Sequence, residues 1–368
     1  MNFLAGETRP DHVPGEYLAK WAQDLPKISL HRHLEGSLRL RTLAEIASEY
    51  HITLPVYEVE ALRPYVQITS DPPNFHNYIG KFSLLRHFYV SQEIIQRIVS
   101  EVIADAAQDN VRYMELRFNP VALSRIRNFA LSDAVDWVVA AAAKAQETYH
   151  CRTCLILQIP REDPVAIAEE IVDIAIAHLG PQVRAIDLAG DEVHHPPQLF
   201  AVPFRRAKQA GLHIVGHAGE AMGAESVRNA LTYLDAERIG HGIRSIEDPA
   251  VLQMLRDRGT TLEVCPTSNF QTGAAPNPPD HPLYDLYHLG IRVTVNTDNP
   301  SISATSLSNE YVVSVRDIGL KPGAIYRTLR NAVDAAFIPD DECDWLWDTI
   351  YDGLAPYPGA REIFSAPR

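Results

Sequence analysis

The sequence has few of the features that mark secreted, membrane-spanning or nucleic-acid-binding proteins. No apolar run approaches the ~18 residues of a membrane helix, and four cysteines in 368 residues are too few for a disulfide framework. Lysine and arginine total 33 against 47 acidic residues, a formal net charge of −14. Such a chain repels phosphate backbones and anionic lipids. We therefore expect a soluble cytoplasmic protein whose partner is a small molecule, with no nucleic acid and no membrane.

Two local patterns that would change this interpretation are incomplete. Residues 1–17 contain no basic stretch followed by an apolar run, so we expect no secretory signal. Cys151 and Cys154 form a C-x-x-C pattern, which occurs in redox and zinc sites. The pattern lies in a β-rich segment and has no second pair to complete a zinc site, so we interpret both cysteines as structural.

Short apolar segments recur along the chain, and each is followed by a longer stretch with helical periodicity. Several are nearly continuous runs of valine, isoleucine and leucine, as expected of strands covered on both faces. We predict eight strands, at residues 27–31, 111–118, 153–159, 183–189, 212–217, 237–241, 260–265 and 291–297. This alternation predicts an α/β fold, a (β/α)₈ TIM barrel. We expect one domain over residues 1–368, with a helical insertion at 36–110 after the first strand.

The alternative architecture is an open, doubly wound sheet. Such folds carry a glycine-rich phosphate-binding turn after the first strand. The segment that follows residues 27–31 has no such turn, so we favour the barrel.

Polar residues gather at the carboxyl ends of the predicted strands, where barrels of this kind build their active sites. His31 and His33 form an H-x-H pattern, and residues two apart in a strand face the same side. His217 and Asp298, at the ends of later strands, add a third nitrogen and a carboxylate oxygen. This set suits Zn²⁺ with a bound water, whose pKa the metal would lower to roughly 7. Iron, manganese or cobalt could be held by the same residues.

Further strand-end residues have side chains suited to proton transfer or to binding. Glu220 is a candidate general acid and base, and its alternative role is to cap the next helix. His241 could orient or deprotonate a metal-bound water, or it is one more buried histidine. Asp298 can bind the metal and also accept a hydrogen bond from the water, while Asn299 points towards whatever occupies the pocket.

Six segments resemble the defining motifs of the adenosine deaminase family, within the amidohydrolase superfamily. In chain order they are PKISLHRHLEGSL, DLAGDE, HAGE, RIGHGIR, LEVCPTSNFQTG and VTVNTDNP. The resemblance runs from about residue 26 to residue 340, and six motifs in register are more specific than any one. It implies membership of the adenosine and adenine deaminase branch, with one Zn²⁺ per chain held by His31, His33, His217 and Asp298.

The resemblance also implies the reaction. A 6-aminopurine nucleoside, foremost adenosine or 2′-deoxyadenosine, would be converted to inosine or 2′-deoxyinosine and ammonia, a step of purine metabolism. Glu220 would protonate purine N1 while metal-bound hydroxide attacks C6. His241 and Asp298 would position and activate the water, and Gly190 would contact N3.

Two positions depart from the family pattern. Where the family usually has Asp-Asp, this chain has Asp298 and Asn299. We expect Asn299 to bind purine N7, because an amide donates without first taking up a proton. Glu35 replaces an aspartate that reaches towards the ribose 5′-hydroxyl in adenosine-specific members, and adenine-specific members have glutamate there. One added methylene moves the carboxylate by about an ångström, so Glu35 bears on the choice of substrate.

The predicted insertion contains an aromatic stripe that resembles the family's helical lid. Phe75, Tyr78, Ile79 and Phe82 fall at helical spacing, which predicts one amphipathic helix. The stripe could equally pack into the core in part, and we expect Ile79 and Phe82 to line the substrate pocket.

Other functions remain open at this point. Adenine deaminase and aminodeoxyfutalosine deaminase share the chemistry, whereas an AMP deaminase is disfavoured because the lid and first loop show no basic cluster. A catalytically inactive zinc-binding scaffold is the alternative outside enzymology, and the complete set of site residues counts against it. The sequence does not indicate an oligomeric state.

Overall fold

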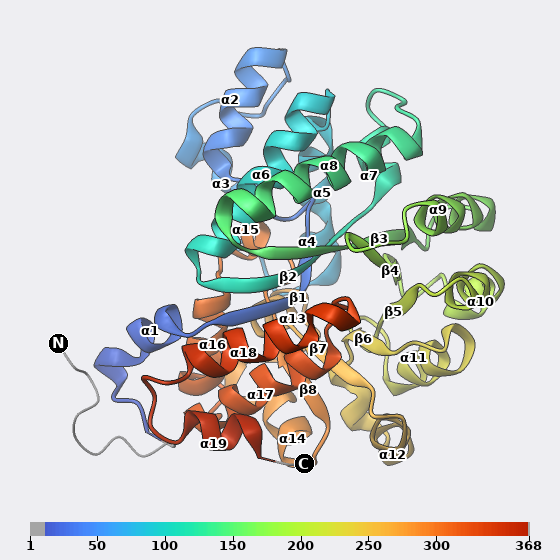
Figure 1. Ribbon diagram of the computed structural model, residues 1–368. Coiled ribbons are helices and arrows are strands. Elements are labelled where there is room, and N and C mark those ends of the chain that lie inside the picture. The colour runs from blue at the N-terminus through green and yellow to red at the C-terminus, as the bar shows by residue number, and fades with distance from the viewer. Residues whose placement is uncertain (1–11, 367–368) are drawn as a thin grey trace.

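The computed structural model describes residues 12–366 and contains one eight-stranded parallel sheet in the order β1 to β8 (Figure 1). Most of residues 1–17, where no secretory signal is expected, lies outside the described residues. The strands are β1 Lys27–His33, β2 Val111–Phe118, β3 Arg152–Pro160, β4 Val183–Ala189, β5 His213–Ala218, β6 Arg238–His241, β7 Thr261–Val264 and β8 Arg292–Val295. The predicted barrel is confirmed, and each predicted strand overlaps an observed one.

Helices surround the strands and cover their outer faces (Figure 1). They are α1 Gly15–Asp24, α2 Leu40–Tyr50, α3 Val59–Val66, α4 Phe75–Gly80, α5 Phe82–Leu85, α6 Gln92–Gln108, α7 Pro120–Ser124, α8 Leu131–Tyr149, α9 Val165–Ala177, α10 Ala201–Gln209, α11 Ala224–Asn229, α12 Pro249–Arg258, α13 Pro266–Gln271, α14 Leu283–His288, α15 Pro300–Ser303, α16 Leu307–Arg316, α17 Pro322–Ala335, α18 Cys343–Gly353 and α19 Ala360–Ser365. Among residues 12–366, no helix has the length and apolar character needed to cross a bilayer.

The barrel closes between β8 and β1 through residues just beyond the end of β8. Asp298 donates its backbone N–H to the His31 carbonyl over 3.0 Å and accepts from the His33 N–H at 2.9 Å. The Asn296 side-chain oxygen accepts from the backbone N–H groups of Leu30, at 2.9 Å, and His31, at 3.2 Å. This seam therefore depends on one buried carboxamide and on the turn that contains Asp298.

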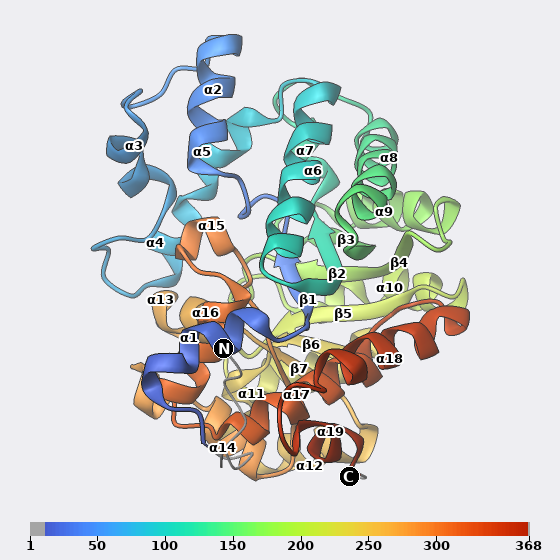
Figure 2. The ribbon, with the colours of Figure 1, turned by 60° about the vertical axis from the view of Figure 1, so that its left-hand side comes forward.

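The segment between β1 and β2 is helical, and Figure 2 shows α2 to α5 stacked on one side of the barrel. The single helix predicted from the aromatic stripe is wrong, because α4 ends at Gly80 and α5 begins at Phe82. At the break, Lys81 donates its N–H to the Tyr78 carbonyl three residues back. Its ammonium group donates to the Pro64 carbonyl at 2.7 Å, a tertiary contact that the periodicity does not encode.

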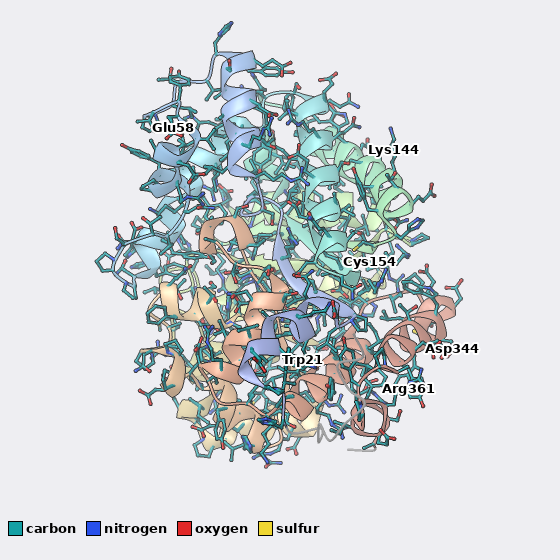
Figure 3. The ribbon with its side chains drawn as sticks, turned by 90° about the vertical axis from the view of Figure 1, so that its left-hand side faces the viewer. Trp21, Glu58, Lys144, Cys154, Asp344 and Arg361 are labelled. Carbon is teal, nitrogen blue, oxygen red and sulfur yellow. The ribbon has the colours of Figure 1, made fainter. Side chains whose placement is uncertain are left out.

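The cysteines of the C-x-x-C pattern are buried in the main apolar cluster. Burial raises the pKa of Cys151 to about 12 and that of Cys154 to about 11, so both thiols are protonated at neutral pH. At the rim, α1 is held by Trp21, whose indole N–H donates to the Tyr326 hydroxyl of α17 at 3.0 Å (Figure 3).

Replacement of Asn296 by alanine should destabilise the protein. The substitution leaves the buried N–H groups of Leu30 and His31 without their acceptor, at a cost of about 2–4 kcal/mol. We expect the midpoint of thermal unfolding to fall by several degrees in differential scanning calorimetry. Asn309→Ala, on the exposed face of α16, is the control and should leave the midpoint near the wild-type value. Equal midpoints for the two variants would contradict the role assigned to the seam.

Candidate active site

Four potential ligand atoms converge at the carboxyl ends of β1, β5 and β8. The Nε2 atom of His33 lies 3.2 Å from the Nε2 atoms of both His31 and His217. The Asp298 Oδ1 atom lies 3.3 Å from His31 Nε2 and 3.2 Å from His33 Nε2. All four residues are buried. The structure thus brings together the four residues that the sequence singles out as metal ligands.

The hydrogen bonds of the three histidines decide what this group of atoms can bind. Each Nδ1 atom faces a side-chain oxygen: Glu263 at 2.8 Å for His31, Gln158 at 2.9 Å for His33, and Asp187 at 3.1 Å for His217. A proton held on Nδ1 leaves each Nε2 with a free lone pair.

Three lone pairs and a carboxylate at such short range repel one another unless a cation lies between them. In a tetrahedral site with bonds of about 2.0 Å, the ligand atoms are about 3.3 Å apart, close to the separations seen here. Burial also lowers the pKa of His217 to about 4 despite the neighbouring Asp187, so its ring is neutral at pH 7. The donor set fits a metal ion, and its nitrogen and oxygen atoms suit Zn²⁺.

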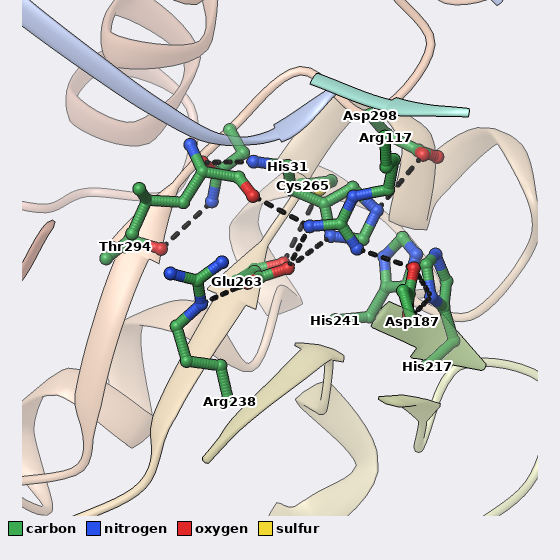
Figure 4. Close-up of polar contacts among 12 residues, drawn as sticks. His31, Arg117, Asp187, His217, Arg238, His241, Glu263, Cys265, Thr294 and Asp298 are labelled. Atoms are coloured by element: carbon green, nitrogen blue, oxygen red, sulfur yellow. Dashed lines mark hydrogen bonds and ion pairs between the residues drawn. The ribbon is translucent and has the colours of Figure 1, made fainter. Parts of the chain in front are cut away.

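A buried network of charged residues lies directly beneath these ligands (Figure 4). Arg117 binds Asp187 Oδ2 at 2.9 Å and Glu263 Oε2 at 2.7 Å. Arg238 binds Glu263 at 2.7 Å and makes a short contact with Glu115. Although burial opposes the shift, Arg117 and Arg238 hold the pKa of Glu263 well below its usual range. His217 and Arg117 likewise lower the pKa of Asp187 against the effect of burial, so the acceptors that orient His31 and His217 are both ionised.

The sequence motifs do not mark this network as part of the site. Its only sequence signal is the presence of charged residues inside otherwise apolar strands, as in ELRF, IDLA and TLEV. Both orientations of such a residue, inward or outward, are compatible with one sequence, so the pattern alone does not place it in the barrel interior.

Glu220 and His241 lie beside the ligand group and contact each other. Their Oε2 and Nε2 atoms are 3.5 Å apart, and Asn269 donates to His241 Nδ1 at 2.9 Å. Burial, together with the charges of Asp298 and Glu192, raises the pKa of Glu220 well above its usual value. Burial lowers the pKa of His241. At neutral pH the pair therefore combines a carboxylic acid, which can donate a proton, with an uncharged imidazole.

The local backbone supports a specialised role for this end of the barrel. His241 and Asp298 both adopt φ of 61°, a left-handed conformation that is costly for residues other than glycine and that concentrates at functional sites. Glu220 does not cap the following helix, because α11 has Gly223 at its N-cap position and no side-chain cap. The structure therefore disfavours the capping alternative for Glu220.

Tyr78 belongs to the site, although Ile79 and Phe82 are the residues of the stripe predicted to line the pocket. Its hydroxyl lies 2.9 Å from Ser303 Oγ and 3.4 Å from Asp298 Oδ2. The same carboxylate oxygen accepts from Ser268 at 2.6 Å. These contacts fix the Asp298 oxygen that does not face the histidines. Tyr78 is buried whereas Ile79 is 38 % exposed.

A cavity of about 290 Å³ opens above the ligand group, and all five predicted substrate-binding residues line it: Glu35, Ile79, Phe82, Gly190 and Asn299. One Glu35 oxygen accepts from the Asn119 N–H at 2.6 Å, while the other is buried and has no hydrogen-bond partner among residues 12–366. The side-chain oxygen of Asn299 is likewise unpartnered. Gly190 has φ of 109°, and a Cβ there would meet the Glu162 carboxylate at 2.5 Å.

Two arginines also line the cavity, although the sequence shows no basic cluster near the lid or the first loop. Arg86 belongs to the 3₁₀ turn Arg86–Phe88, and Arg125 directly follows α7. Arg125 pairs with Asp163 at 3.2 Å. The two are far apart in sequence, so only the fold places them in one cavity wall.

Comparisons with known proteins agree with this geometry. A family model described as "Adenosine deaminase" matches residues 26–353. An adenosine deaminase of Shigella flexneri is 35 % identical over 318 residues, which cover 86 % of this chain and 95 % of that protein.

Three solved structures share the fold closely. The adenine deaminase of Arthrobacter aurescens has a TM-score of 0.83 at 28 % identity, covering 90 % of this chain and 99 % of that one. An amidohydrolase of Burkholderia ambifaria, described with bound Zn, has a TM-score of 0.80 at 26 % identity over 95 % and 98 % of the two chains. The N6-methyl-AMP deaminase of Arabidopsis thaliana has a TM-score of 0.80 at 28 % identity, over 92 % and 99 %.

Substitution of Asp187 by asparagine should weaken metal binding. The variant keeps the shape of the acceptor but removes the charge that orients His217, and changes of this kind typically cost about 10–100-fold in affinity. Competition with a chromogenic chelator measures the apparent zinc affinity. Asp136→Asn, which alters an Asp–His pair with His178 on the protein surface, is the matched control. Unchanged affinity in the Asp187 variant would rule out this role.

Proposed function

Since this chain belongs to the adenosine deaminase family, we propose that it is a zinc-dependent hydrolase that deaminates adenosine and 2′-deoxyadenosine. The products are inosine or 2′-deoxyinosine and ammonia. The observation that carries the proposal is the convergence, in one cavity, of a metal-type ligand set with Glu220 as an acid and His241 as an uncharged imidazole.

In this proposal His31, His33, His217 and Asp298 hold one Zn²⁺. When bound, the metal supplies a Lewis acid that makes a water molecule nucleophilic at neutral pH. The Asn269 amide donates to His241 Nδ1, which places the proton of the neutral imidazole on Nε2, so His241 would orient that water by donating to it. The Asp298 carboxylate is held by Ser268 and Tyr78, which leaves its other oxygen facing the ligand group.

Glu220 is the proton donor to purine N1. Its raised pKa keeps the proton on the carboxyl group at neutral pH. Protonation of N1 draws electron density from C6, so the water oxygen can add there. The C6–N6 bond then breaks, and the amino group leaves as ammonia with the proton that the water released. The new C6 hydroxyl returns its proton to Glu220, and a 6-oxopurine protonated at N1 remains.

We assign the substrate contacts to the residues that line the cavity. Asn299 donates to N7, Gly190 contacts N3, and Glu35 interacts with a ribose hydroxyl through its unpartnered oxygen. Burial raises the pKa of Glu35, which favours a protonated carboxyl that donates to that hydroxyl. Residues 36–110 form the lid of a single domain, with Ile79 and Phe82 over the ribose.

A second candidate substrate is a 6-aminopurine nucleoside with an anionic group on its ribose side. Arg86 and Arg125 favour it, because two guanidinium groups in the cavity wall suit a phosphate or a carboxylate. Adenosine monophosphate and aminodeoxyfutalosine are examples. Adenine is a third option, since Glu35 matches the adenine-specific pattern. An inactive scaffold is disfavoured because the full set of reactive groups lies in place.

Glu220→Gln should abolish most turnover without loss of metal. Glutamine keeps the shape of the side chain but has no acidic proton, so we expect kcat to fall by about 10²–10⁴-fold. Ammonia release measures kcat, and atomic emission measures bound zinc. His217→Ala should lose zinc and activity together, whereas Glu225→Gln, on the exposed part of α11, should resemble wild type. A Glu220→Gln enzyme of near-normal rate would exclude the proton-donor role.

A substrate panel distinguishes the candidates. We expect kcat/KM of the zinc-loaded protein to be highest for adenosine and 2′-deoxyadenosine, compared with adenine, adenosine monophosphate and aminodeoxyfutalosine. If an anionic nucleoside leads instead, Arg86→Ala should reduce kcat/KM for it about tenfold more than for adenosine, a difference of about 1.4 kcal/mol. If kcat/KM is highest for adenine, the ribose contacts assigned to Glu35 and the lid are wrong.

A further inference from the structure

The carboxylate of Glu192 is enclosed by the loop that carries Glu220. Glu192 follows β4, and the loop, residues 219–222, follows β5. One Glu192 oxygen accepts from the Gly219 N–H at 2.6 Å. The other accepts from Glu220 at 3.2 Å, Ala221 at 2.8 Å and Met222 at 3.1 Å. Four consecutive backbone donors thus point at one buried side chain.

This arrangement is an anion-binding concavity made by the backbone. Successive N–H groups that curve around one point favour a negative charge there, and hydrogen bonds to a charged acceptor are about twice as strong as neutral ones. Glu192 is buried, so little water competes for these donors. A nearby cation, Arg161, also lies at the base of the loop and donates to the His217 carbonyl.

The loop has few other anchors. It is neither helix nor strand, and it turns at Gly219, where φ is 70° and a Cβ would meet Val227 at 2.6 Å. The Arg244 backbone N–H donates to the Gly219 carbonyl at 3.1 Å, and its guanidinium donates to the Ala221 carbonyl at 3.0 Å. The N–H groups at 219–222 all bind Glu192, and they include that of Glu220 itself.

We propose that Glu192 is the positioning residue for Glu220. By binding the four N–H groups, it holds the Glu220 carboxyl in the cavity, 3.5 Å from His241. This inference rests on the proposed function, because it assigns Glu192 a role through the proton donor. The negative charge of Glu192 also helps to keep the proton on Glu220, because it is among the groups that, after burial, raise the pKa of Glu220.

The test begins with Glu192→Gln. Glutamine fits the same space, but in either orientation of its amide the NH₂ group would face at least one of the four backbone N–H donors, so the loop must shift. A displacement of about 1 Å at a reacting group can cost on the order of 10²-fold. We expect kcat for the substrate that leads the panel to fall about 10–100-fold, with KM and zinc content within about twofold of wild type. A purely structural role would lower the unfolding temperature and leave kcat per zinc-loaded site unchanged.

The decisive measurement combines this change with Glu220→Gln. If Glu192 acts through Glu220, then Glu192→Gln should alter kcat by less than about twofold in the Glu220→Gln background. The same fold loss in both backgrounds would overturn the proposal. Glu237→Gln is the matched control: this glutamate accepts from the Ile214 N–H at 3.2 Å, near the start of β5 and away from the cavity.

Two further outcomes keep this proposal separate from the proposed function. If Glu192→Gln fails to fold or to load zinc, Glu192→Asp retains the charge on a shorter side chain, and its kcat should be reduced less than that of Glu192→Ala. Equal losses in those two variants would overturn the proposal. A wild-type protein that deaminates no aminopurine overturns both ideas, whereas normal turnover in Glu192→Gln overturns only the role of Glu192.

Discussion

The guanidinium of Arg117 is the interaction on which the arrangement of the site depends. From β2 it reaches the Leu30 carbonyl in β1 at 2.7 Å, Asp187 in β4 and Glu263 in β7. A buried charge is tolerated only when it is paired and hydrogen-bonded. Without this cation, two carboxylates would be left poorly compensated inside the barrel, and these carboxylates orient His217 and His31. One side chain thus compensates the two buried carboxylates that orient the predicted ligands His31 and His217.

Two buried glutamates of the site have opposite protonation states because their neighbours differ. Glu263 and Glu220 are both buried, yet the arginines around Glu263 hold its pKa low while burial and the charges of Asp298 and Glu192 raise that of Glu220. Separation of pKa values between neighbouring carboxyl groups is a common way for one site to contain both a fixed charge and a proton donor. The chemistry therefore depends on the partners that the fold supplies to each carboxyl group.

Much of the fold was predictable from the sequence, because strands buried on both faces leave long apolar segments. The H-x-H pattern and the strand-end positions of His217 and Asp298 likewise pointed to one group of ligands. Tyr78 was not selected, since a helical stripe does not show which of its members reaches Asp298. The break at Lys81 and the approach of Arg86 and Arg125 to one cavity depend on contacts between distant segments.

The seam between β1 and β8 has a consequence for the order in which the molecule is assembled. Three of the four ligands, His31, His33 and Asp298, lie at this seam, joined across more than 260 residues of chain. A nascent chain that stops before the last strand has only part of the ligand set. Assembly of the full ligand set therefore requires the chain as far as Asp298, and a metal ion held there would link the first and last strands.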